Sequence, residues 1–468
     1  MTAIAGSNSQ SATAGHPTIT TLTLTQYSSE IVLQLDGFAA SFTHSVAVPL
    51  MRAERRARDS HLEKAHDKNL TNQHIIRHID PMEADIENLL VWAKSQGIEI
   101  NGCSPKQLHG RGVGIVATRA LEANHVILRV PTATLRSLAN TPRAITARLP
   151  GASVHALLAV SLCLDLASPS LAAWRAVFPS RADIRAALPL CWPSELRALL
   201  PPSASARLAR QSAAFHRDWA SVEAAAYDSA ALTKDEFLYA WLLVNTRSFY
   251  HATRFTAKRP KEDHMVLQPV ADLFNHAGDA PGGAFCVGSF DDAAFTVTTR
   301  AAHAPGDELF IQYGPHGNDF LLVEYGFTLP SPLNDAWDET SLDPYLCPAL
   351  AAAGHRTVLE EAGFWGQYML DRETACYRTH VALRALCLTP LQWRAVLDGE
   401  RDEDRDRARV EAALVAVVLR PAEEDAAAHI RDVDEATAGE ALSRQALRDR
   451  WVQIMELLVG MRQKLESQ

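Results

Sequence analysis

The sequence predicts an α+β protein in which a β-rich region is split by a helical insertion and followed by a helical C-terminal unit. Short β-branched runs typical of strands occur at about 113–130 and again within 246–328. Between these stretches, and again after Pro330, apolar residues recur at helical spacing. The 468 residues are enough for two or three domains, and a 47% hydrophobic share is ordinary for a globular protein.

Charge and cysteine content exclude several classes of function. The formal charge of −10 opposes attraction of the whole protein to nucleic acid or anionic lipid. The seven cysteines include no CxxC pair, which favours reduced thiols and argues against a cysteine-only zinc site. The longest apolar stretch, Ala152 to Leu164, is much shorter than the ~20 residues of a membrane span. No lysine or arginine precedes Arg52, so we expect a cytoplasmic or nuclear protein without a secretory signal.

The first elements follow an accessory leader. Residues 1–79 begin with a Ser- and Thr-rich stretch and are expected to be largely disordered. Asp80 can cap a helix that Gly97 ends. After this helix, Val113–Ala117 and Val126–Val130 predict a pair of strands joined by a turn.

The insertion, at about 136–245, is expected to be helical. Apolar spacing predicts helices at Leu157–Leu166 and Ser205–Tyr227. Thr233 and Glu236 form a capping box that predicts the start of a further helix.

The chain beyond the insertion returns to strands and loops. Ala294–Thr299 and Glu308–Gln312 are flanked by Gly and Pro and are predicted to be strands. A first domain would therefore span residues 80–330. Residues 331–468 would form a helical C-terminal domain.

The first chemical motif is the glycine-rich run His109–Gly114. A dinucleotide-binding loop would need a strand before the glycines and a helix after them. Here the glycines lead instead into the strand-like residues Ile115–Ala117. The run therefore favours a loop whose backbone approaches a ligand, with a plain tight turn as the alternative.

Two further motifs carry polar groups beside apolar runs. In Asn245–Phe249, Arg247 could hold a ligand carboxylate by a bidentate pair, or form a surface salt bridge. In Val270–His276, the four-residue spacing of Asp272 and His276 suggests a metal, but no second ligand pair lies nearby, so none is expected. Asn275 and His276 are more typical of groups that bind the polar edge of a ligand.

The last motifs are two Tyr-Gly pairs. Gly306–Gly314 reads as a strand that ends in Tyr313, and Glu324–Phe327 contains Tyr325. One tyrosine at a strand end is usually structural, but two can line a narrow aromatic slot. The GxSxG motif of many serine hydrolases is absent from the sequence.

Together these motifs resemble the SET-domain protein methyltransferases, and more narrowly the subfamily typified by the Rubisco large-subunit lysine methyltransferase. They occur in one order: Gly-Arg-Gly-Val-Gly, the helical insertion, Thr-Arg-Ser-Phe, Ala-Asp-Leu-Phe-Asn-His, Ile-Gln-Tyr-Gly and Glu-Tyr-Gly-Phe. The resemblance implies a SET-domain β-fold with a pseudoknot over residues 80–330. It also implies that the all-α C-terminal domain is similar to the subfamily's substrate-binding domain.

The resemblance implies an S-adenosylmethionine-dependent protein-lysine N-methyltransferase that acts on a non-histone protein, such as a ribosomal protein. Its cofactor-binding residues would be Arg111, Gly112 and Val113 through their backbone, Arg247 at the carboxylate, and Asn275 with His276 at the polar head and adenine. The catalytic residue would be Tyr313, and the substrate channel would contain Tyr325, Phe285 and Phe249. Because Phe285 stands where some members carry a tyrosine, the number of methyl groups transferred stays open.

Two alternatives stay open beside this reading. A related branch methylates histidine, and a degenerate SET protein could act as a binding scaffold without catalysis. The intact Asn275, His276 and Tyr313 argue against the scaffold. We expect a monomer that binds a protein substrate and uses neither a metal, nor nucleic acid, nor a membrane.

Overall fold

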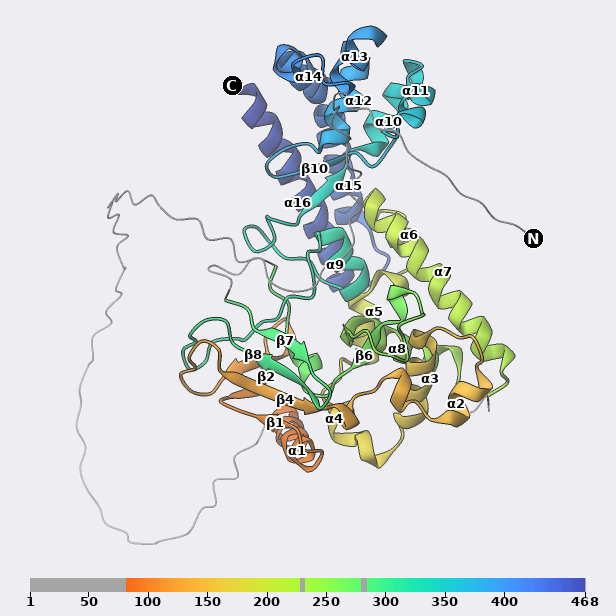
Figure 1. Ribbon diagram of the computed structural model, residues 1–468, viewed down its shortest axis with the longest axis vertical. Helices are drawn as coiled ribbons and strands as arrows, with labels where there is room; N and C mark the ends of the chain where they lie inside the picture. Colours follow the sequence, from red (N-terminus) through yellow and green to blue (C-terminus); the bar gives the residue numbers. More distant parts are fainter. Residues whose placement is uncertain (1–80, 228–231, 279–283, 468) are drawn as a thin grey trace, which may run out of the picture. The chain divides into compact units, whose positions relative to one another are not determined.

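The computed structural model describes residues 81–227, 232–278 and 284–467, which lie in one compact unit. The expected leader, residues 1–79, and the helix cap at Asp80 lie outside the described residues. Within them the chain mixes helices and strands, which confirms the predicted α+β class (Figure 1). The domain boundaries proposed above stay predictions.

The main sheet has four antiparallel strands in the order β1-β4-β8-β7 (Figure 1). Two more antiparallel pairs, β2 with β3 and β5 with β6, lie outside it. The bounds are β1 (Glu99–Ile100), β2 (Cys103–Leu108), β3 (Gly112–Ala117), β4 (Val126–Pro131), β5 (Ser248–Tyr250), β6 (Met265–Leu267), β7 (Val287–Phe290) and β8 (Ala294–Thr298).

The strands correct two expectations. The runs Val113–Ala117 and Val126–Val130 do form strands, but β3 pairs with β2, and β4 pairs with β1 and β8. The predicted strand Glu308–Gln312 does not form a continuous ladder of backbone hydrogen bonds with another strand. Glu308 bridges to β3, whereas Ile311 bridges in parallel to His276 and to Cys286. Because this segment divides its hydrogen bonds among separate partners, no continuous strand forms there.

The helix before the sheet and the helices of the insertion lie close to their predicted positions. Ser153 caps α3, and Thr233 caps α8 by accepting a hydrogen bond from the amide of Glu236. This is one half of the predicted capping box, because the Glu236 carboxylate binds Arg181 instead. Their bounds are α1 (Pro81–Ser95), α2 (Arg143–Arg148), α3 (Val154–Asp165), α4 (Ala172–Ala176), α5 (Arg181–Ala187), α6 (Ser194–Arg197), α7 (Pro202–Ala224) and α8 (Lys234–Arg247).

Short 3₁₀ turns connect these elements. The turn η6 (Ala271–Leu273) matters for the site because it carries Asp272. The others are η1 (Thr132–Thr134), η2 (Leu138–Asn140), η3 (Pro169–Leu171), η4 (Pro189–Cys191), η5 (Lys261–Asp263) and η8 (Glu403–Asp406).

The C-terminal part is mostly helical, as expected, with one addition. Two three-residue strands, β9 (Glu339–Ser341) and β10 (Met369–Asp371), pair antiparallel, and runs this short leave no readable alternation in the sequence. The helices are α9 (Asn318–Tyr325), α10 (Asp343–Ala352), α11 (Arg356–Glu361), α12 (Tyr377–Cys387), α13 (Pro390–Leu397), α14 (Arg407–Ala413), α15 (Arg420–Glu435) and α16 (Ala441–Glu466), with the π-helical η9 (Leu414–Leu419) before α15.

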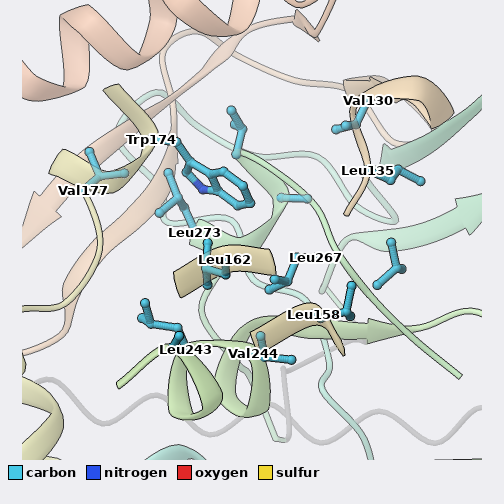
Figure 2. Packing of buried hydrophobic residues seen from close by; sticks show 14 of the residues in the cluster. Val130, Leu135, Leu158, Leu162, Trp174, Val177, Leu243, Val244, Leu267 and Leu273 are labelled. Carbon is cyan, nitrogen blue, oxygen red and sulfur yellow. The ribbon is translucent and has the colours of Figure 1, made fainter. Parts of the chain in front are cut away.

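The first hydrophobic core supports the segment that carries the candidate site. Figure 2 shows buried side chains from β4, α3, α8, β6 and η6 packed together with Trp174. The indole Nε1 of Trp174 donates to both carboxylate oxygens of Asp272, at 3.2 Å each. This core therefore fixes η6 both by packing and by a buried hydrogen bond.

A second core joins the C-terminal helices to α9 and to part of the insertion. Its polar anchor is Arg450 on α16, whose side chain is fully buried. The Arg450 Nε lies 2.6 Å from Asp319 Oδ1, and its Nη1 lies 2.9 Å from Asp338 Oδ2. Because Asp319 is on α9, this cluster ties the last long helix to the helix that ends at Tyr325.

No single helix among the described residues is long and apolar enough to cross a membrane. The pair Val154–Asp165 and Pro169–Ala176 passes that test jointly by length and composition, but it is bent by 106°.

Candidate active site

A cavity of about 210 Å³ opens between the end of α8, η6 and the end of α9. It brings together residues of four of the five motifs found in the sequence. Its lining residues are Thr246, Arg247, Ser248, Phe249, Tyr250, Ala271, Asp272, Phe274, Ile311, Gln312, Tyr313 and Tyr325.

Arg247 enters this cavity from the last position of α8. Its Nη1 donates to the backbone oxygen of Asp272 at 2.9 Å and lies 3.2 Å from Asp272 Oδ2. Burial raises the pKa of the Asp272 carboxyl group, and the neighbouring guanidinium offsets part of this effect. The Arg247 Nε is buried and has no hydrogen-bond partner among the described residues. Arg247 is thus held at one end while a donor stays available for an anionic ligand.

Asn275 is fixed by Glu308. The Asn275 Nδ2 donates to Glu308 Oε1 at 2.8 Å, and Arg111 Nη2 lies 2.7 Å from Glu308 Oε2. A side chain at Gly114 would collide here, because its Cβ would lie 2.8 Å from Asn275 Nδ2 and 2.9 Å from Glu308 Oε1. Gly114, the last glycine of the first motif, therefore lets β3 approach the segment that contains Asn275 closely.

The remaining glycine-loop residues lie apart from the cavity lining. Gly112 begins β3 with a positive φ of 68°, and Val113 packs against the first core. Arg111 does not line the cavity, and it contacts Glu308 and the ring of Phe310. Their predicted backbone contacts to a cofactor stay predictions.

Tyr313 and His276 form a tightly connected pair. The Tyr313 hydroxyl donates to the Phe274 carbonyl oxygen at 2.7 Å, and its backbone amide donates to His276 Nδ1 at 3.1 Å. Their rings stack with centroids 5.0 Å apart. Burial raises the pKa of Tyr313 well above its usual range, so the phenol stays protonated near neutral pH.

His276 is a neutral imidazole near pH 7. Burial, followed by the effect of His316, lowers its pKa to about 4. Its Nε2 is buried without a hydrogen-bond partner among the described residues. This ring therefore offers a polar group to a ligand without adding positive charge.

The two tyrosines of the Tyr-Gly pairs meet at the cavity. The rings of Tyr313 and Tyr325 have centroids 4.9 Å apart, and Phe327 lies 6.5 Å from Tyr313 and 6.3 Å from Tyr325. Burial raises the pKa of Tyr325 to about 12. The expected aromatic slot is therefore present in the geometry.

The two phenylalanines predicted for the channel differ in position. Phe249 lines the cavity and packs edge-on against Phe295, with centroids 5.2 Å apart. Phe285 is not among the lining residues, and its ring lies 5.5 Å from the guanidinium carbon of Arg300. A part for Phe285 in a channel stays a prediction, whereas Tyr250, which the motifs did not single out, does line the cavity.

Glu324, directly before Tyr325, gathers donors from two helices of the insertion. Arg207 Nη1 and Gln211 Nε2, both on α7, donate to it at 2.9 and 2.8 Å. Asn245 Nδ2, on α8, donates to its side chain at 3.1 Å and to its backbone oxygen at 3.0 Å. This cluster fixes the end of α9 relative to the helix that carries Arg247.

The motifs contain three carboxylates whose structural roles the sequence did not indicate, namely Asp272, Glu308 and Glu324. Each is a carboxylate whose partner lies far away in the chain, such as Gln211 for Glu324. Within residues 81–227, 232–278 and 284–467, no group of three or more His, Cys, Asp or Glu side chains could hold a metal ion.

The arrangement can hold a ligand with an anionic group at Arg247 and present its reactive end to the tyrosines. Arg247, Tyr313 and Tyr325 line the cavity. Asn275 and His276 are not among its lining residues, although they directly follow the lining residue Phe274 in the chain, so their contact with a ligand stays a prediction.

Comparison of the chain with known proteins gives consistent similarities. No protein-family model matches it. The chain is 32% identical to "Ribosomal lysine N-methyltransferase set11" of Schizosaccharomyces pombe over 196 residues, which is 39% of this chain and 48% of that protein. It is 27% identical to "SET domain-containing protein 4" of Mus musculus over 383 residues, 76% of this chain and 85% of that one. The match thus spans about half of the first relative and most of the second.

Solved structures share the fold. The SET domain of LSMT bound to lysine and AdoHcy superposes with a TM-score of 0.54 at 17% identity. The match covers 82% of this chain and 92% of that chain.

Proposed function

We propose that this chain, which is a SET-domain protein of the Rubisco large-subunit methyltransferase type, is an S-adenosylmethionine-dependent protein-lysine N-methyltransferase. The observation that carries the proposal is one cavity that is lined by Arg247 and by the contacting pair Tyr313 and Tyr325. Support also comes from relatives named as ribosomal lysine N-methyltransferases and from similar structures that bind AdoMet or lysine with AdoHcy.

The residues present fit this cofactor. It carries a carboxylate, for which the buried and unpaired Nε of Arg247 is a suitable donor. Its amino group and adenine need neutral polar partners, and Asn275 with the uncharged His276 provide them. When bound, S-adenosylmethionine supplies a methyl group on a positively charged sulfur.

The acceptor nitrogen must be uncharged to attack a methyl group. A free lysine has a pKa of ~10.4, so only about one molecule in a thousand is neutral at pH 7, which corresponds to roughly 4–5 kcal/mol. Removal from water between the rings of Phe249, Tyr313 and Tyr325 disfavours an ammonium and lowers the lysine pKa, and the positively charged sulfur of the cofactor, when bound, would act in the same direction.

Tyr313 acts as an orienting group and not as a base. Its hydroxyl proton is donated to Phe274, so the lone pairs on its oxygen are left to accept a hydrogen bond from an amine. Alignment of the amine with the methyl group provides several kcal/mol of the rate acceleration, on the order expected for near-attack geometry. Arg247, Asn275 and His276 meanwhile hold the other end.

For the substrate we propose a ribosomal protein, supported by the identity to the fission-yeast relative of that name. The cytoplasmic or nuclear location expected from the sequence is part of the same proposal. The test is incubation of extract from cells lacking the protein with tritiated S-adenosylmethionine and the purified chain, with heat-inactivated chain as the control. We expect labelled bands whose peptides carry methylated lysine.

Two outcomes would replace this proposal. Label on a histidine ring would assign the chain to histidine methylation. Tight calorimetric binding of the cofactor without any labelled band, or no binding at all, would support a scaffold without catalysis.

A further inference from the structure

The connection between β5 and β6, residues 251–264, presents a cluster of unpaired positive charges beside the cavity. Arg254, Lys258 and Lys261 are exposed and make no ion pair with any residue that the structure describes. A fourth cation, Arg259, is neutralised by Asp263 at 2.9 Å. This local excess of positive charge contrasts with the formal charge of −10 of the whole chain.

The β5–β6 connection is held firmly from within. The buried Asp263 accepts a hydrogen bond from the amide of Val154 at 2.7 Å through its Oδ1. His264, also buried, contacts Thr256 O with its Nε2 at 2.8 Å and the Tyr250 hydroxyl with its Nδ1 at 3.0 Å. These contacts fix the backbone that carries the exposed cations, so little ordering entropy is lost when a partner binds.

The connection starts at the cavity itself. Tyr250, the last residue of β5, lines the cavity and is 63% exposed, which places it at the opening. Four residues further on, Arg254 lies over the ring of Phe255, which is 52% exposed.

We infer that the β5–β6 connection binds acidic side chains that flank the acceptor lysine, so that the substrates are lysines with Asp or Glu a few residues away. The inference rests on the proposed function, because it specifies the substrate class of the same cavity. Opposite charges at this opening favour the encounter and fix the direction of the peptide. An exposed aromatic beside the cations, Phe255, adds apolar contact with the peptide.

The observations favour a peptide over a nucleic acid. Three free cations, with Glu262 exposed in the same connection, form a small surface compared with the basic stripes that bind polynucleotides. The strongly acidic total charge would also oppose approach of a long polyanion.

The test uses three peptides with the same central lysine, whose flanking positions are all Glu, all Gln or all Lys. For the full-length wild-type chain we expect kcat/KM to fall in that order, by about 3- to 10-fold at each step, as is usual for a few exposed ion pairs. The differences should shrink at 1 M salt, where the screening length is ~3 Å.

The variant that tests the surface is the triple charge reversal R254E/K258E/K261E. We expect it to reverse the order of the peptides. A matched control, K94E/R217E/R431E, changes the net charge equally at exposed cations that do not line the cavity, and should keep the wild-type order. The single change R254Q should weaken the preference without reversing it.

Fluorescence anisotropy of the same peptides separates this inference from the proposed function. Charge-dependent binding without methyl transfer would support the peptide-binding role of the β5–β6 connection and contradict the proposed methyltransferase activity. Methyl transfer with equal kcat/KM for all three peptides, or an unchanged order of the peptides in the triple variant, would contradict the peptide-binding role of the β5–β6 connection. Either result would leave the proposed methyltransferase activity supported. Loss of affinity for a single-stranded RNA in the triple variant, with peptide preference intact, would assign the cations to nucleic acid and also overturn the inference.

Discussion

The hydroxyl group of Tyr313 donates a hydrogen bond of 2.7 Å to the carbonyl oxygen of Phe274. These two residues are 39 positions apart, yet this bond fixes the phenol at the point where the Asn275–His276 segment passes Ile311. The proton of the phenol is therefore engaged by the protein, and its oxygen is left as an acceptor toward the cavity. This relationship is the reason why we propose Tyr313 as the group that orients an amine.

Removal of this hydroxyl should stop most turnover. In Tyr313→Phe we expect the rate of methyl transfer to fall by at least about 100-fold, on the order of the loss of one well-placed catalytic hydrogen bond, while cofactor affinity stays within a few-fold. Steady-state rates with labelled cofactor and calorimetric titration measure the two effects. Tyr345→Phe, which removes a hydroxyl bonded to Asp425 outside the cavity, is the matched control. Near wild-type turnover in Tyr313→Phe would show that the hydroxyl has no such role.

Loss of Arg247 should act on cofactor binding. A charge-assisted hydrogen bond contributes about 1.5–3 kcal/mol, so Arg247→Ala should raise the dissociation constant of the cofactor by roughly 10- to 100-fold. Isothermal titration calorimetry measures this change directly. Arg136→Ala, which removes a guanidinium paired with Asp165 outside the cavity lining, should leave the constant unchanged. An equal dissociation constant in both variants would contradict the placement of Arg247.

The sequence predicted which segments meet, because the motifs occur in an order that resembles one fold. It did not predict how those segments are held together. The bond from Asn275 to Glu308 spans 33 positions, and that from Gln211 to Glu324 spans 113. Such contacts depend on the packed fold and not on local spacing, so no pattern near Glu324 indicates its partners.

The strands show the same contrast between local features, which the sequence predicts, and long-range contacts, which it does not. Periodicity placed Val113–Ala117 and Val126–Val130 in strands, because β-branched runs carry a local signal. The pairing partners of these strands could not be predicted from the sequence, because pairing depends on which strands pack on the same core. In the structure β4 lies between β1 and β8. The helices of the insertion were easier to predict from the sequence, because a cap such as Thr233 acts within one turn of its own helix.

Glu324 should matter for stability as well as turnover. Glu324→Ala removes the carboxylate that accepts from Arg207, Gln211 and Asn245, so the guanidinium of Arg207 loses its acceptor and the two amides keep only their bonds to backbone oxygens. We expect this loss to cost about 1–3 kcal/mol. We expect urea unfolding to show this loss, with a reduced turnover because the end of α9 shifts Tyr325. Glu99→Ala, at an exposed pair with Arg129, should change the free energy of unfolding by less than about 1 kcal/mol. Equal stabilities of the two variants would show that the Glu324 cluster is not structural.

The buried cluster around Arg450 should be costly to break. Arg450→Met leaves the carboxylates of Asp319 and Asp338 buried without their cation, so we expect a loss of about 3–5 kcal/mol in the free energy of unfolding. Arg448→Met, two residues earlier, removes only an exposed pair with Asp434 and should lose less than about 1 kcal/mol. Chemical denaturation compares them. Similar midpoints for the two variants would contradict the role of Arg450 as an anchor.

His276 should make stability depend on pH. Burial lowers its pKa in the folded chain to about 4 from the ordinary value of 6.5, so the unfolded chain binds more protons between these values. The free energy of unfolding therefore rises with pH from about 4 to 6.5, and this contribution is lost as pH falls through that window.

Denaturant unfolding at several pH values isolates this term. His276→Asn should show a shallower rise between pH 4 and 6.5 than wild type. His109→Asn, at an exposed position outside the cavity, should keep the wild-type slope. Identical slopes in wild type and His276→Asn would exclude a buried neutral imidazole at this position.

The most direct measurement is a single turnover with the chain in excess over a lysine-containing protein acceptor and S-adenosylmethionine carrying a deuterated methyl group. Tandem mass spectrometry then locates the label. We predict the deuterated methyl on the side-chain nitrogen of a lysine for wild type, and none for Tyr313→Phe under the same conditions. Cofactor that binds but leaves every acceptor lysine unlabelled would contradict the account.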